Sequence, residues 1–149
     1  MQRRTFINMA AGSMLVFATG GFSGTLLAAN PEPVKVVYHM VDGIDQASRG
    51  LGNIRNHLRE VPDTKIVVVA HGEGINFLLD GAVDRNGKTF DDQVAALASQ
   101  GVEFRVCRNT LTARNILPSR LVLEAKVVPA GVVEVARLQA REGFVYLRP

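Results

Sequence analysis

The sequence contains one cysteine, Cys107, among its 149 residues, and it contains no tryptophan. A single cysteine excludes an intrachain disulfide, a zinc site built from several cysteines and an iron–sulfur cluster. The chain also lacks a Gly-x-Ser-x-Gly elbow and the glycine-rich loops that hold phosphate groups. These absences exclude the usual serine hydrolases and give no reason to expect a nucleotide or any other cofactor.

An excess of charge of one sign is also missing from most of the chain. The 17 Lys and Arg residues face 14 Asp and Glu residues, and two of the basic ones are Arg3 and Arg4, close to the N-terminus. The remainder is nearly neutral, so we expect no binding of nucleic acid. The apolar fraction of 47% is typical of a folded protein, and about 120 residues suffice for one core.

The N-terminal segment carries no charge between Arg4 and Glu32. Its Arg-Arg-Thr-Phe-Ile start at residues 3–7 resembles a twin-arginine motif, and small residues follow the apolar stretch. We predict that residues 1–29 are an export signal and that residues 30–149 form the domain, which places the protein in the periplasm. If the signal is not cleaved, it would anchor the protein to the membrane.

Strand-like and helix-like segments alternate after this leader. We expect strands at 34–39, 65–70, 102–107, 125–128 and 144–147, and helices at 48–60, 75–79, 90–100, 110–117 and 132–142. The run of four β-branched residues at 66–69 shows no alternation, which is typical of a strand covered on both faces of a parallel sheet. The pattern predicts an α/β fold, namely a three-layer α/β/α sandwich with a five-stranded, mostly parallel sheet.

Three reactive side chains follow the first three expected strands: His39, His71 and Cys107. The carboxyl ends of parallel strands lie at one edge of a sheet, so we expect these residues to line a cleft. Cys107 precedes a helix that begins near Asn109, and a helix start favours a thiolate. Arg108 is close enough in sequence to reach the sulfur. A free cysteine can equally be buried and inert, and the residues alone leave both interpretations open.

The segment Val102–Leu111 resembles the active-cysteine segment of the DsrE/DsrF family of sulfur-relay proteins, in which a strand ends in cysteine and a leucine follows four residues later. Arg114 and the order of the other segments agree over residues 34–149. The resemblance implies the sandwich fold of that family, assembly into trimers or hexamers, and a cysteine that carries sulfur as a persulfide. It therefore implies that Cys107 is catalytic and that its partners are sulfur donors and acceptors, either proteins or small sulfane-sulfur compounds.

Two other functions remain open at this stage. The relays of this family work in the cytoplasm, whereas this chain has an export signal, so the first alternative is a non-catalytic binding or assembly module in which Cys107 is structural. The second is a small metal-binding protein, because two imidazoles and a thiolate suit copper or zinc. We expect Cys107 to react quickly at pH 7 if it carries sulfur, and only after unfolding if it is structural.

Overall fold

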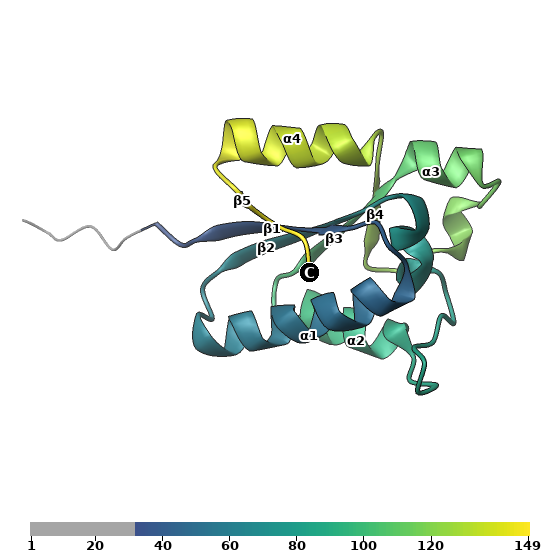
Figure 1. The fold of residues 1–149 in the computed structure, drawn as a ribbon, viewed down its shortest axis with the longest axis horizontal. Coiled ribbons are helices and arrows are strands. Elements are labelled where there is room, and N and C mark those ends of the chain that lie inside the picture. The colour runs from purple at the N-terminus through teal and green to yellow at the C-terminus, as the bar shows by residue number, and fades with distance from the viewer. Residues whose placement is uncertain (1–31) are drawn as a thin grey trace, which may run out of the picture. The chain divides into compact units, whose positions relative to one another are not determined.

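The computed structural model describes residues 32–149 (Figure 1). The predicted export signal at residues 1–29 lies outside the described residues. None of the helices in the described part combines the length and the apolar character that a membrane span requires.

Five strands and four α-helices alternate along residues 32–149, together with two 3₁₀ helices. Their order is β1 (Lys35–Met40), α1 (Ile44–Glu60), β2 (Lys65–Ala70), η1 (Gly72–Leu78), α2 (Phe90–Ala98), β3 (Glu103–Cys107), α3 (Arg108–Ala113), η2 (Pro118–Arg120), β4 (Ala125–Val128), α4 (Gly131–Glu142) and β5 (Val145–Leu147). The strands form one sheet in the order β4-β3-β2-β1-β5, and every neighbouring pair is parallel. The predicted fold class is confirmed.

Helices cover both faces of this sheet. Helices α1 and α2 lie on one face, and α4 crosses the other face in contact with β1, β2, β3 and β5 (Figure 1). The chain reaches β5 by a crossover from β4 at the far edge, so the last strand pairs with the first. The molecule thus has the three layers that the alternation of elements predicts.

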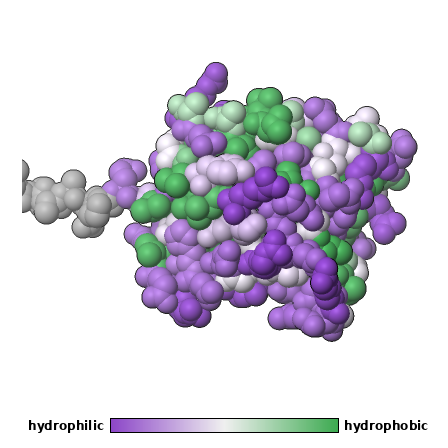
Figure 2. Space-filling model, viewed as in Figure 1, coloured by the Kyte–Doolittle hydropathy of each residue, from purple (hydrophilic) through white to green (hydrophobic). Residues whose placement is uncertain are grey.

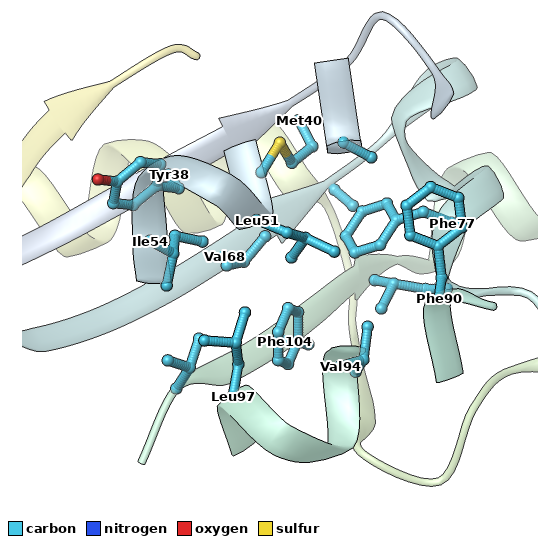
Figure 3. Close-up of a cluster of buried hydrophobic side chains, with 14 of the residues drawn as sticks. Tyr38, Met40, Leu51, Ile54, Val68, Phe77, Phe90, Val94, Leu97 and Phe104 are labelled. Carbon is cyan, nitrogen blue, oxygen red and sulfur yellow. The ribbon is translucent and has the colours of Figure 1, made fainter. Parts of the chain in front are cut away.

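The two faces of the sheet bury different amounts of apolar surface. The larger core lies under α1 and α2, where Phe77 contacts Phe90 and Phe104 edge-to-face at centroid distances of 5.9 and 6.3 Å (Figure 3). The smaller core under α4 has six buried members: Val37, Val67, Val69, Val135, Leu138 and Phe144. Successive strand residues alternate between these cores because side chains of a strand point to opposite faces.

Two helical segments begin earlier than the sequence indicates. Helix α1 starts at Ile44 instead of residue 48, and the buried Gln46 accepts hydrogen bonds from the N–H groups of Val41 and Asp42 at 2.6 and 2.8 Å. The expected turn and helix after β2 are a single 3₁₀ helix, η1. Its Gly74 lies against the end of β1, where a Cβ atom would come within 2.1 Å of the Met40 oxygen.

Candidate functional site

The first three strands direct His39, His71 and Cys107 to the α4 face of the sheet. His39 and Cys107 occupy β1 and β3 at positions that alternate with the residues of the larger core. His71 follows β2 directly, and since Ala70 pairs with Val106, His71 falls beside Cys107 in the parallel register. The structure therefore brings together the three residues that the sequence singled out at strand ends.

Helix α4 closes over these residues through its first residue, Gly131. A Cβ atom at Gly131 would lie 3.1 Å from the His71 Cβ and 3.2 Å from the Cys107 Cβ. Only glycine allows the backbone of α4 to approach so closely without displacing its neighbours. Gly131 thus lets the peptide N–H at the start of α4 reach the thiol.

Cys107 lies where two helices begin. It is the N-cap residue of α3, and the first residue of α4 faces it as well. Burial raises the pKa of the Cys107 thiol, but the Gly131 N–H, the Thr110 side chain and the N–H groups of Thr110 and Asn109 together lower it below its ordinary value. Hydrogen bonds from the starts of both helices and from the Thr110 hydroxyl therefore favour the thiolate.

The hydroxyl group of Thr110 joins the thiol to the loop after β2. The N–H of Gly72 donates to Thr110 Oγ1 at 3.1 Å, which leaves the hydroxyl proton free for the sulfur. The Arg114 Nη1 donates to the Gly72 oxygen at 3.2 Å and to Asn76 Oδ1 at 2.8 Å. Arg114 therefore supports the loop that orients Thr110 and makes no direct contribution to the thiolate.

The two histidines form a pair beside the thiol. Their ring centroids are 4.8 Å apart, and His39 Nδ1 shares a hydrogen bond of 2.9 Å with the Tyr146 hydroxyl of β5. Burial lowers the pKa of both rings, and the neighbouring His71 and Arg148 lower the pKa of His39 further while Asp42 opposes them. Both imidazoles are therefore neutral at pH 7.

A network of ion pairs and hydrogen bonds connects α4 to the sheet close to Cys107. Arg105, two residues before Cys107 on the same face of β3, donates to Glu134 in the first turn of α4 and to Glu103 at 2.9 Å. The Arg105 and Glu134 side chains are only 15% and 12% exposed. Arg137 and Glu142 of α4 extend the network. This ion pair holds the start of α4 over β3, and with it the N–H of Gly131.

Two other expected members of the site take lesser roles. Arg108 is exposed, and within residues 32–149 no hydrogen bond or ion pair joins it to Cys107. Helix α3 begins at Arg108 itself, and the role expected of Arg108 at the sulfur stays a prediction. Asn109 contributes its backbone N–H, while its side chain is exposed.

Three contributors escaped the sequence analysis: Gly131, Thr110 and Tyr146. Gly131 and Tyr146 are far from Cys107 in the chain, and only the crossover through α4 and β5 brings them to the site. Thr110 has a local signal, since the third residue of a helix faces its N-cap. Among the described residues, no three His, Cys, Asp or Glu side chains are grouped as a metal site.

Comparisons with known proteins place this chain in a family. The DsrE/DsrF-like family matches residues 21–148. MTH1491, a protein of unknown function from Methanobacterium thermoautotrophicum, is 32% identical with a TM-score of 0.69, over 78% of this chain and 99% of that one. The ychN protein from E. coli shares the fold, with a TM-score of 0.63 and 14% identity. That match covers 78% of this chain and 98% of the ychN chain. No curated protein matches the sequence. Since the match spans most of its length, the chain belongs to the DsrE/DsrF-like family.

Proposed function

We propose that the protein handles sulfur, with Cys107 as the residue that accepts a sulfane sulfur atom as a persulfide and passes it to a partner. The observation that carries this proposal is the setting of the thiol. Its pKa is lowered by N–H groups from the starts of both α3 and α4. A thiolate is the form of cysteine that attacks sulfur, and membership of the family adds support.

The chemistry needs no cofactor. The Cys107 thiolate attacks the outer sulfur of a donor such as thiosulfate, a new S–S bond forms, and sulfite leaves with the electron pair of the broken S–S bond. With a polysulfide donor, the shortened polysulfide anion leaves instead. Because the chain has no second cysteine, the sulfur must leave by attack from an acceptor thiolate on another molecule.

The low exposure of the thiol limits the donor. Cys107 is 5% exposed, so a folded partner cannot press a broad surface onto the sulfur. A small sulfur anion, or an extended segment of a partner that presents one sulfur atom, fits this access best. We therefore expect inorganic donors to load Cys107 without a donor protein.

Intact-mass measurement after incubation with polysulfide or thiosulfate tests the proposal. We expect a gain of one sulfur atom, about 32 Da, that is reversed by dithiothreitol and absent from Cys107→Ser. The alkylation rate of the folded protein should also be high at pH 7. A thiol that stays unmodified in the folded protein between pH 7 and 9 would contradict the proposal and leave the binding module as the function.

We further propose that the protein works in the periplasm as a homo-oligomer. The twin-arginine-like start of the sequence supports the location, and replacing Arg3 and Arg4 by lysine should then retain the protein in the cytoplasm. Exposed apolar side chains support the assembly: Val132 and Val133 of α4 are 60% and 63% exposed, and Figure 2 shows hydrophobic surface over the α4 layer. A monomer mass in light scattering at micromolar concentration would contradict the assembly.

A further inference from the structure

Two buried nitrogen atoms beside Cys107 lack a hydrogen-bond partner: Nε2 of His39 and Nε2 of His71. Buried polar atoms in folded proteins nearly always have a partner, and leaving one without is unfavourable. The same rings pack against each other, and His71 lies beside the Cys107 thiol, whose pKa is lowered by the hydrogen bonds around it although burial opposes them. Their unused hydrogen-bonding capacity therefore needs an explanation.

The chemical state of the rings makes them donors. Burial keeps both imidazoles neutral at pH 7, so each ring carries one N–H group. When the Tyr146 hydroxyl donates to His39 Nδ1, the ring proton of His39 resides on Nε2. His71 makes no side-chain hydrogen bond with any described residue and can place its proton on Nε2 as well. Neither Nε2 atom has a hydrogen-bond partner within residues 32–149, so the pair offers unused N–H donors.

The geometry places His71 within reach of a sulfur atom added to Cys107. His71 Cδ2, the ring carbon bonded to Nε2, lies 3.3 Å from the Cβ position of Gly131, and the Cys107 Cβ lies 3.2 Å from the same point. His71 Nε2 makes no hydrogen bond to the Cys107 sulfur itself. A persulfide extends the side chain by about 2 Å, so its outer sulfur can come within reach of the neighbouring His71 ring.

We propose that His71, supported by His39, is the seat for the outer sulfur of a Cys107 persulfide. This inference rests on the proposed function. The His71 N–H donates a hydrogen bond to the terminal sulfur anion, so the orphaned donor gains its partner when the protein is loaded. His39 packs against His71 at a tilted angle and restricts that ring, and the hydrogen bond with Tyr146 restricts His39.

The seat also assists transfer of the sulfur to an acceptor. An acceptor thiolate attacks the outer sulfur, a new S–S bond forms, and the bond to Cys107 breaks with its electron pair moving to Sγ. Two anions must meet in this step, and the His71 hydrogen bond reduces the negative charge on the outer sulfur. The Gly131 N–H receives the departing Cys107 thiolate. Both products are anions, as both reactants are, so no proton or redox partner is needed.

The test compares His71→Phe, which keeps a ring without a donor, with His71→Asn, which restores a side-chain N–H. The matched control is His57→Gln, since His57 lies on α1, bonded to Tyr38 and away from Cys107. Each full chain is loaded with polysulfide, and the persulfide lifetime and its rate of transfer to a small thiol are followed by intact mass. The alkylation rate of the unloaded thiol is measured in parallel.

Without an acceptor thiol, we expect His71→Phe to shorten the persulfide lifetime about tenfold, as the loss of one hydrogen bond to an anion predicts. Transfer to the added small thiol should be slower than in the wild type, while the unloaded thiol alkylates within about twofold of the wild-type rate. His71→Asn should have a persulfide lifetime between those of His71→Phe and the wild type. His57→Gln should have the wild-type lifetime. If the wild type loads and His71→Phe behaves like it, this inference is wrong and the proposed function stands. If the wild type does not load, both are wrong. Should His71→Phe not fold, an unchanged lifetime in His39→Phe overturns the inference.

Discussion

The two faces of the sheet differ in what they bury. The face under α1 and α2 buries a continuous apolar core that includes three phenylalanine rings. The face under α4 buries six apolar side chains beside an ion pair, two histidines and the only cysteine. Because apolar burial dominates folding stability, the first face holds the domain together. The second face contributes less to stability and can therefore accommodate polar groups, and the candidate site lies there.

The largest expected effect separates the two faces by stability. Phe104→Ala removes a fully buried ring from the larger core and should lower the free energy of unfolding by about 3–5 kcal/mol. Val67→Ala, at a fully buried position on the α4 face, should cost only about 1–2 kcal/mol. Urea unfolding followed by circular dichroism measures both. Equal losses of unfolding free energy in the two variants would contradict the greater contribution of the larger core to stability.

The next effect tests whether the ion pair positions the site. Arg105→Met leaves Glu134 without its link to β3, and we expect a loss of about 2 kcal/mol together with a higher pKa of the Cys107 thiol. Arg137→Met is the matched control, since Arg137 binds the same carboxylate from within α4. The control should leave the thiol pKa nearly unchanged. The pH dependence of the alkylation rate measures the thiol pKa. Equal pKa shifts in both variants would mean that the loss of a positive charge, and not the position of α4, changes the thiol pKa.

Acid should weaken the α4 face first. Hydrogen bonds from Arg137 and Arg105 lower the pKa of Glu134 although burial opposes them, and the Arg105 hydrogen bond likewise lowers the pKa of Glu103. A carboxyl group with a lowered folded pKa contributes stability above its unfolded value of about 4.3, and this stability disappears as the pH falls through the folded pKa. Glu134→Gln should therefore flatten the decline of Tm between pH 5 and pH 3 by an amount equivalent to about 1 kcal/mol.

The histidine pair acts in the same direction at higher pH. Burial lowers the pKa of both His39 and His71, so their neutral forms contribute stability above about pH 6.5 that is lost as the pH falls through the folded values. A Tm that rises on acidification from pH 7 to pH 5 would contradict the burial of these rings.

The smallest effect concerns Thr110. Thr110→Val keeps the shape of the side chain but removes the hydroxyl that lies between the Gly72 N–H and the sulfur. We expect the thiol pKa to rise by about half a unit with little change in stability, whereas Thr110→Ser should keep the wild-type value. The pH dependence of alkylation measures this shift. An unchanged profile in Thr110→Val would show that the hydroxyl does not interact with the thiolate.

Sequence reasoning predicted the layers of the fold and part of the site because both depend on local patterns. Uninterrupted β-branched runs mark buried parallel strands, and their ends place His39, His71 and Cys107 at one edge of the sheet. The close approach of Gly131 and the contact of His39 with Tyr146 depend on the crossover from β4 to β5, which no local pattern reveals. The role expected of Arg108 depends on how its side chain extends from the first turn of α3, which the sequence pattern does not determine.

The pairing of the last strand with the first has a consequence for the newly made chain. During synthesis β1 through β4 emerge in the order in which they lie across the sheet, but the second edge of β1 stays unpaired until β5 has left the ribosome. The seat beside Cys107 shares this delay, because the Tyr146 hydroxyl that fixes His39 belongs to β5. A nascent chain can therefore form most of its apolar core while its histidine pair is still unfixed, and the emergence of β5 completes the sheet and the site in one step.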